Sequence, residues 1–186
     1  GWVLDADGRF PGQVSMTAFN PLIPGNSDDW SIPGAFFEVT VKNDQPDPLR
    51  YSVAFSLANL CAGGQVNRFS QEGGISQMRL FQSTLPPDDP AFGELCMATD
   101  ADEVSYQEYW YRGRWRDHIE TFWRNFTEQP RFINRTYDTP GNSDTATLCV
   151  SAEIAPGESK SFRFVLTWHF PNNYNYWNPY QKDGRD

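Results

Sequence analysis

Residues 145–170 read TATLCVSAEIAPGESKSFRFVLTWHF, and they form the most regular stretch of the chain. Apolar and polar side chains alternate over residues 160–170, with Phe162, Phe164 and Leu166 in one row, which is the period of a half-buried β-strand. Residues 145–153 predict a second strand, and Pro156-Gly157 between the two is typical of a tight turn. We therefore expect a β-hairpin in the core of the protein.

The same alternation predicts further strands along the chain. They lie at residues 14–19, 35–41, 50–57, 75–82, 93–99 and 104–111. The prolines and aspartates of residues 43–48 are typical of a turn, so the strands on either side of it are expected to pair as an antiparallel hairpin with one buried face. The glycine pairs within residues 62–74 predict an exposed excursion between strands.

One segment has the period of a helix. Trp115, Ile119, Phe122 and Phe126 fall at i, i+4, i+7 and i+11, which predicts a helix over residues 115–126 with these side chains on its buried face. His118 is expected on the opposite, exposed side. Together the elements predict an all-β fold, a two-sheet antiparallel β-sandwich with one short amphipathic helix.

The sandwich is expected to occupy residues 1–171 as one domain, because a chain of 186 residues can bury a sizeable core without a staple or a metal. Residues 172–186 begin with an aromatic, polar and aperiodic stretch that cannot extend a sheet. We interpret them as a linker toward a C-terminal domain that this chain does not contain.

The charge of the chain limits the partners it can have. A formal net charge of −9 argues against a nucleic acid or an anionic membrane, because both would be repelled. No apolar run is long enough to span a bilayer, so we expect no transmembrane segment and a soluble protein, with the cytoplasm favoured. A neutral ligand or another protein is the expected partner.

Metal, cofactor and thiol chemistry find little support in the sequence. Cys61, Cys96 and Cys149 lie far apart without a C-x-x-C spacing and are predicted to be buried free thiols. The stretch Asp5-Ala6-Asp7-Gly8 resembles the opening of a calcium loop, but the later ligand positions are missing, so a solvated turn is expected. We predict neither a metal site nor a cofactor.

Hydrolytic chemistry needs carboxyl groups that face each other across a bond, roughly 5 Å apart in retaining glycosidases. The acid pairs Asp28-Asp29 and Asp88-Asp89 are neighbours in turns, and adjacent side chains point apart. His118 and His169 lack a serine or cysteine motif around them. No catalytic residue is therefore predicted in this chain.

The proline-rich residues 18–33 are predicted to form a stiff crossover between strands. They also carry a resemblance, together with residues 36–43, 51–59, 155–159 and 164–172. These ordered blocks are similar to the N-terminal domain of the non-lysosomal glucosylceramidase (bile-acid β-glucosidase) family, glycoside hydrolase family 116. The resemblance implies a β-sandwich that precedes an α/α toroid, and it places the catalytic glutamate and aspartate in that second domain.

The first hypothesis is therefore a non-catalytic scaffold domain of a β-glucosidase-like enzyme, which packs on the catalytic domain and lends part of the rim of its cleft. The candidate substrate-binding or domain-interface residues are Asp28, Asp29, Trp30, Tyr174, Tyr176 and Trp177.

Two alternatives remain open. One is a carbohydrate-binding module for a β-glucoside or another neutral sugar, because planar aromatic side chains stack on pyranose rings. Trp30, Trp110, Trp115 and Trp177 are its candidates, although Trp110 and Trp115 are more simply interpreted as core. The other alternative is a stand-alone interaction domain.

Overall fold

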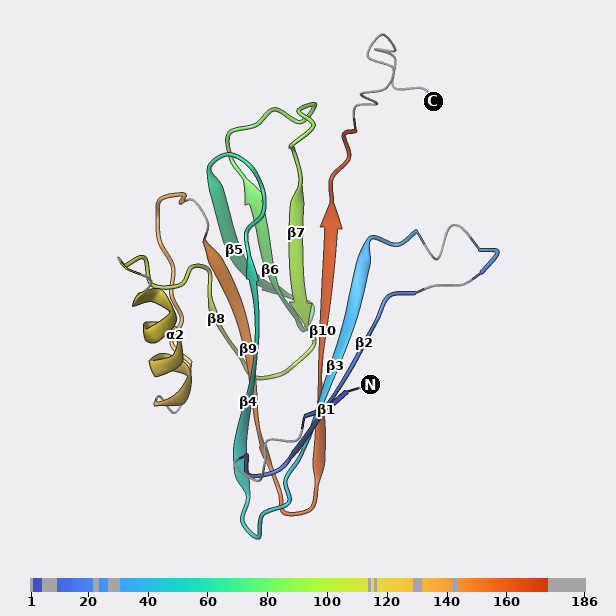
Figure 1. Cartoon of the computed structure of the whole chain (residues 1–186), viewed down its shortest axis with the longest axis vertical. Helices are drawn as coiled ribbons and strands as arrows, with labels where there is room; N and C mark the ends of the chain where they lie inside the picture. Colours follow the sequence, from blue (N-terminus) through green and yellow to red (C-terminus); the bar gives the residue numbers. More distant parts are fainter. Residues whose placement is uncertain are drawn as a thin grey trace.

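The computed structural model describes residues 2–4, 10–21, 24–26, 31–113, 115, 117–128, 132–141 and 144–173. In these residues two antiparallel sheets face each other and a single helix lies beside the smaller sheet (Figure 1). The predicted two-sheet β-sandwich with one short helix is confirmed. The described part of the chain contains no helix long and apolar enough to cross a membrane.

The larger sheet has seven strands and the smaller one has three. In spatial order the large sheet consists of β1 (Trp2–Leu4), β2 (Gln13–Phe19), β3 (Gly34–Lys42), β10 (Ser159–His169), β7 (Glu94–Thr99), β6 (Ile75–Gln82) and β5 (Gln65–Glu72). The small sheet consists of β4 (Leu49–Ala58), β9 (Thr145–Ile154) and β8 (Val104–Gln107).

Both predicted hairpins are wrong, although their strands exist. β10 pairs with β3 and β7, whereas β9 pairs with β4 and β8, so β9 and β10 lie in opposite sheets. The same holds for β3 and β4. Alternation shows that a strand has one apolar face but not which strand it pairs with. Here the apolar rows of consecutive strands meet across the core instead of lying side by side.

The core fills the space between the inner faces of the two sheets. Its buried members from the large sheet are Val41, Met78, Leu80, Leu95, Met97, Phe162 and Phe164. From the small sheet come Tyr51, Ala146, Leu148, Val150, Ala152 and Ile154. Phe55 of β4 joins the sheets, because its ring lies 5.1 Å from Phe37 and 5.1 Å from Phe164.

The glycine-rich excursion is also a wrong prediction, because its middle part is β5, the strand at the end of the large sheet. Gly63, Gly73 and Gly74 have positive φ and form the turns before and after this strand. β5 pairs with β6 along one side. Its polar composition hides the alternation that identifies the other strands.

The predicted helix exists as α2 (Asp117–Thr127), and two members of the predicted apolar stripe, Phe122 and Phe126, pack toward the small sheet, whereas Trp115 and Ile119 do not. Phe122 and Asn125 are buried, while Ile119 is exposed and Trp115 precedes the helix with 98% of its surface exposed. Interpreting Trp115 as core was therefore wrong. His118 is half-buried, with its ring 6.0 Å from that of Trp110, and not on an exposed face as expected.

The buried face of α2 covers part of the outer surface of the small sheet. Phe122 stacks on Trp110 with ring centroids 4.3 Å apart, and it packs with Phe132 against Cys149 and Ala54. β8 ends at Gln107, earlier than predicted, so Trp110 leaves the sheet and lies under the helix.

One buried asparagine joins the two turns that carry the chain from sheet to sheet. The turn between β3 and β4 and the turn between β9 and β10 lie together at the lower end of the sandwich in Figure 1. Asn43 is fully buried between them, and its Nδ2 donates to the carbonyls of Asp47 and Ile154, each at 2.8 Å. Its Oδ1 and backbone take further hydrogen bonds from Gln45 N, the Tyr51 hydroxyl and Gly157 N, and its own N–H donates to Glu158 O.

We predict that Asn43→Ala lowers the free energy of unfolding by about 3 kcal/mol, because it leaves buried carbonyl and N–H groups of both turns without partners. Chemical denaturation followed by circular dichroism measures this loss. Asp44→Ala, next to it but exposed, is the control and should change stability by about 0.5 kcal/mol or less. Equal effects of the two variants would contradict the role assigned to Asn43.

Candidate functional site

The predicted site residues Asp28, Asp29, Trp30, Tyr174, Tyr176 and Trp177 all lie outside the described residues. The described residues that flank them lie at one end of the large sheet. Gly34 is opposite Thr167 in the β3–β10 ladder, and Trp168 N donates to Pro33 O at 3.1 Å. The two predicted groups are thus attached to the same end of neighbouring strands, and their role stays a prediction.

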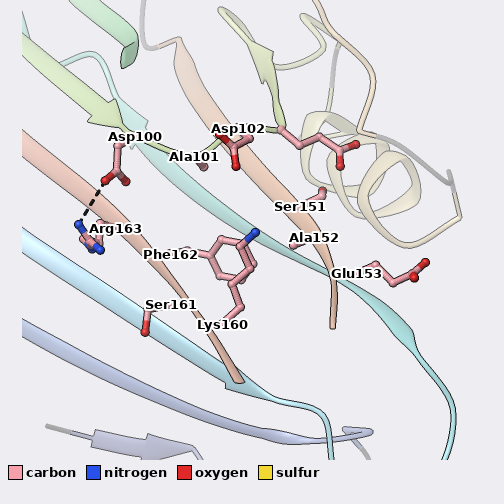
Figure 2. A pocket seen from close by; sticks show the side chains of 11 residues that line it. Asp100, Ala101, Asp102, Ser151, Ala152, Glu153, Lys160, Ser161, Phe162 and Arg163 are labelled. Atoms are coloured by element: carbon pink, nitrogen blue, oxygen red, sulfur yellow. Dashed lines mark hydrogen bonds and ion pairs between the residues drawn. The ribbon is translucent and has the colours of Figure 1, made fainter. Parts of the chain in front are cut away.

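A polar cleft of about 370 Å³ opens beside the connection from β7 to β8 (Figure 2). It is lined by residues 100–103, 151–153 and 160–163. Figure 2 shows Asp100 and Arg163 facing each other, and the two groups are 3.3 Å apart. Exposed ion pairs of this kind are screened by water and contribute little to stability. The cleft therefore holds solvated charges without a buried acid or base.

A second cleft is built around a tightly held arginine. The guanidinium of Arg112 donates from Nε and Nη2 to the two carboxylate oxygens of Asp144, at 3.0 and 2.9 Å, and from Nη1 to Thr139 O at 2.8 Å. It lies between two tyrosine rings, 4.3 Å from the centroid of Tyr109 and 4.6 Å from that of Tyr137. Two-point pairing and cation–π contacts fix this side chain in one orientation.

The hollow next to this arginine, which we call the Arg112 cleft, has a volume of about 330 Å³. It is lined by Trp110, Tyr111, Arg112, Gly113, His118, Gly141, Asp144 and Thr145. A Cβ at position 141 would lie 2.0 Å from Asp144 Oδ2, so only glycine lets the backbone pass this close to the ion pair. The cleft combines aromatic surface with charged and polar groups.

A buried polar network extends from the Arg112 cleft to β5, and sequence analysis missed it. Glu108 is buried and accepts hydrogen bonds from Phe69 N at 2.9 Å and from Arg68 at 3.2 Å. Asn67 Nδ2 donates to Glu108 O at 2.6 Å, and Asn67 Oδ1 accepts a hydrogen bond from Asn59 Nδ2 at 2.8 Å. The signal was slight, because Glu108 falls in the same alternating row as Tyr106 and Trp110. The hydrogen bonds of Glu108 hold the edge strand β5 in place.

An apolar groove, the outer-face groove, crosses the uncovered side of the large sheet and has a volume of about 570 Å³. It is formed by Thr17 and Phe19 of β2, Phe36 and Glu38 of β3, Arg163 and Val165 of β10, Ala98 of β7 and Ile75 of β6, with Asp100 at its edge. Phe19 stacks on Phe36 at 5.3 Å yet leaves 55% of its surface exposed. The guanidinium of Arg163 also lines the groove, and it forms ion pairs with Glu38 and Asp100.

The acidic turn at residues 88–89 has a structural role. Asp89 Oδ1 accepts from Ala91 N at 2.8 Å, and Asp89 O accepts the amide of Asn172 at 2.8 Å. Within the described ranges, no three His, Cys, Asp or Glu side chains come together in a way that would hold a metal ion. These observations agree with the interpretation of Asp88-Asp89 as a turn and give it no catalytic geometry.

The three cysteines are unpaired thiols, as predicted, with Cys61 and Cys149 buried and Cys96 half-buried. Burial raises the pKa of the Cys149 thiol from 9.0 to about 11, against the opposing hydrogen bonds of Ser105 and Ser151. Burial also raises the pKa of Cys61 and Cys96. Because the thiolate is the reactive form, none of the three is set up as a nucleophile.

Comparison with protein families gives one match that spans nearly the whole chain. A family described as beta-glucosidase 2, glycosyl-hydrolase family 116 N-terminal domain, matches residues 2–183. The match includes residues 18–33, which join the antiparallel neighbours β2 and β3 and were predicted to form a crossover, and it includes the strands of both sheets.

Among solved structures, a kojibiose phosphorylase from the human microbiome shares 10% sequence identity with the chain, at a TM-score of 0.42. The likeness covers 85% of this chain and 16% of that protein. The chain thus spans about a sixth of its length, and a likeness of this size gives no information about activity.

We predict that the buried thiols of the folded protein react slowly with a thiol reagent at pH 8, because burial and the raised pKa keep them protonated. The rate of reaction with Ellman's reagent should rise by about a hundredfold or more in denaturant, on the order expected when a buried group must wait for unfolding. Cys96→Ala removes the half-buried thiol and isolates the other two. Prompt reaction of this variant without denaturant would show that Cys61 or Cys149 is accessible.

Proposed function

Because the chain belongs to the N-terminal domain family of glycosyl-hydrolase family 116, we propose that it is a non-catalytic scaffold domain of a β-glucosidase-like enzyme. The match over residues 2–183 carries this proposal, since it assigns nearly every residue of the chain to the N-terminal domain. The partner is then the catalytic domain, the α/α toroid that the sequence resemblance implies, and the substrate of the whole enzyme is a β-glucoside.

The chemistry of the described residues supports a non-catalytic role. Asp100 takes part in an exposed ion pair, whereas Glu108 and Asp144 hold the fold together. Retaining glycosidases instead need two carboxyl groups roughly 5 Å apart at an open cleft. A scaffold needs only a stable fold and a surface for its partner.

The outer-face groove is the surface that we assign to the catalytic domain. α2 and Trp110 cover part of the outer side of the small sheet, whereas Phe19 and Ile75 stay exposed on the outer side of the large one. Contiguous exposed apolar surface of this kind usually marks a contact with another protein surface. The ion-paired Arg163 at its edge gives the interface a polar rim.

The interface continues to the end of the large sheet that carries the predicted site residues. Ile32, Trp168 and Phe170 are exposed there, next in sequence to Trp30 and to residues 174–177. We propose that Asp28, Asp29, Trp30, Tyr174, Tyr176 and Trp177 extend this surface toward the catalytic domain and form part of the rim of its cleft.

Phe19→Glu should leave the isolated 186-residue chain folded, since the side chain is 55% exposed, and should lower the thermal stability and the β-glucosidase activity of the full-length enzyme. A charge placed in an apolar interface without a partner weakens it by about 2–5 kcal/mol. Trp123→Glu, on α2 and equally exposed at 55%, is the matched control. Equal losses for both variants would place the interface elsewhere.

Trp30→Ala tests the extended part of the interface. We expect the isolated chain to stay folded and the activity or the melting temperature of the full-length enzyme to fall. Differential scanning fluorimetry on both proteins measures this. Marked unfolding of the isolated chain would instead show that Trp30 belongs to the core.

A further inference from the structure

One edge of the small sheet is β4, and no described strand pairs with the side of β4 opposite β9. Asn59 N donates to Asp144 O at the end of the β4–β9 ladder, so the odd-numbered residues of β4 bond to β9. Because backbone groups point to alternate sides along a strand, the N–H and carbonyl groups of the even-numbered residues point away from β9. These residues are Arg50, Ser52, Ala54, Ser56 and Ala58. β4 therefore presents a row of backbone groups to which a further strand can bind.

β5, an edge strand of the large sheet, is closed by side chains, in contrast to β4. Phe69 N donates to Glu108 Oε1 at 2.9 Å, and Asn67 N donates to the Tyr109 hydroxyl at 3.0 Å. Long edge strands are otherwise protected by charged side chains, prolines or bulges. β4 has none of these over residues 51–58, and its register with β9 is unbroken. The edge of β4 is thus open to another strand.

The large sheet extends past β4 and forms a floor beside its open edge. Phe55 of β4 packs on Phe37 of β3 and on Phe164 of β10. Tyr106 of β8 stacks on Phe69 of β5, with ring centroids 3.9 Å apart. The small sheet thus covers the large one only from β5 to β3, and β2 and β1 lie beyond it.

The inner face of β2 is part of this floor. Thr17 and Phe19 line the outer-face groove, so the alternate residues Val14, Met16 and Ala18 project to the inner side. Val14 and Met16 are half-buried, and Ala18 is exposed. The inward residues of β4 that lie next to the floor are also only half-buried, and they are Val53, Phe55 and Leu57. An apolar floor and an open backbone edge therefore meet in one corner, which we call the β4 corner.

The shape of the β4 corner selects a single extended strand as its occupant. A strand paired with β4 lies about 4.8 Å from it and so comes to rest over the inner faces of β3 and β2. A second copy of the sandwich does not fit there, because the β1 and β2 strands of the two copies would need the same space. Strand addition to an open edge also brings its own affinity through main-chain hydrogen bonds.

The charges around the β4 corner lie only at its two ends. Residues 51–58 of β4 and residues 14–18 of β2 contain no charged side chain. The matching strand therefore has apolar residues toward the floor, alternating with small or uncharged polar residues on its other face. The charged groups at the ends are mostly paired with each other, and they are Arg50, Glu103 and Glu153 at one end and Arg112 and Asp144 at the other.

We propose that one extended segment of the full-length enzyme, from outside residues 1–186, pairs with β4 as the fourth strand of the small sheet and packs on the inner face of β2. A single short strand gains little by itself, and a covalent link supplies it at high effective concentration. The inference rests on the proposed function, because it takes the chain to be one part of a longer enzyme. The added strand and the outer-face groove would contact opposite faces of β2.

The test is amide hydrogen exchange with residue resolution, measured on the 186-residue chain and on the full-length enzyme. The N–H groups of Ser52, Ala54 and Ser56 should exchange rapidly in the 186-residue chain and about a hundredfold or more slowly in the full-length enzyme. The N–H groups of Asn67 and Phe69, which already have partners, are the internal control and should be protected in both proteins.

Two variants at one position separate strand addition from folding. Ser56→Pro removes an N–H that points to the open edge, where a proline is tolerated. Ser56→Ala is the matched control, because it keeps this N–H and loses the same hydroxyl bond to Thr147 Oγ1. The two variants of the 186-residue chain should melt within about 2 °C of each other. In the full-length enzyme, only Ser56→Pro should lower the protection of the Ser52 and Ala54 amides, by about tenfold or more.

Three outcomes would overturn the proposal. One is equal exchange of the even-numbered β4 amides in the two proteins, and another is their protection already in the 186-residue chain, which would mean that this chain covers its own edge. The third is equal protection in full-length Ser56→Pro and Ser56→Ala. Should Ser56→Pro fail to fold, the comparison of the two parent proteins still decides.

The proposed function and this inference can fail separately. A full-length enzyme that hydrolyses a β-glucoside but leaves the even-numbered β4 amides in rapid exchange would keep the proposed function and reject the added strand. A full-length protein with those amides protected and no β-glucosidase activity would keep the added strand and reject the proposed function.

Discussion

The buried amide of Asn43 is the constraint on which the sandwich depends. The chain passes between the sheets after β3, β4, β7 and β9, and each passage takes backbone polar groups out of regular ladders. A buried N–H or carbonyl without a partner is strongly unfavourable, so these passages need local partners. Asn43 supplies donors and an acceptor to two of these passages at once. Asn59 serves the passage from β4 to β5, where its Nδ2 donates to Phe81 O and its Oδ1 accepts from Cys61 N. β4 is thus flanked by two buried asparagines, which set the small sheet against the large one.

The different coverage of the two outer faces follows from this arrangement. Because the chain after β8 must return to β9 in the small sheet, α2 and the other described residues between 108 and 141 lie on that side, and their polar network ties them to β5 through Glu108 and Asn67. The large sheet receives no such cover in the described residues, and its exposed Phe19 and Ile75 remain for another surface. A domain whose fold leaves one apolar sheet face open is suited to be one part of a larger enzyme.

The sequence predicted elements better than it predicted their partners. The strands, the helix and the two-sheet class followed from alternation and from the i, i+4, i+7 spacing. Pairing did not, because Phe162 and Val150 have the same apolar rows whether their strands form a hairpin or face each other across a core. The helix face was right for Phe122 and Phe126 and wrong for Trp115, which continues the spacing but precedes Asp117, where the helix begins. β5 was missed because an edge strand can be polar on most positions, as Arg68 and Ser70 are. The polar residues of the Arg112 cleft come from distant parts of the chain, and their meeting depends on the fold alone.

The outer-face groove and the Arg112 cleft lie on different parts of the structure. The outer-face groove belongs to β2, β3, β10, β7 and β6 of the large sheet, while the Arg112 cleft lies between the segment before α2 and the start of β9. No residue lines both, so a catalytic domain seated on the groove would leave Tyr111 and His118 of the cleft uncovered. The two sheets between them are joined through Phe55, which packs on both Phe37 and Phe164. A catalytic domain seated on the groove would therefore pack on the large sheet, while the small sheet keeps α2 as its own cover.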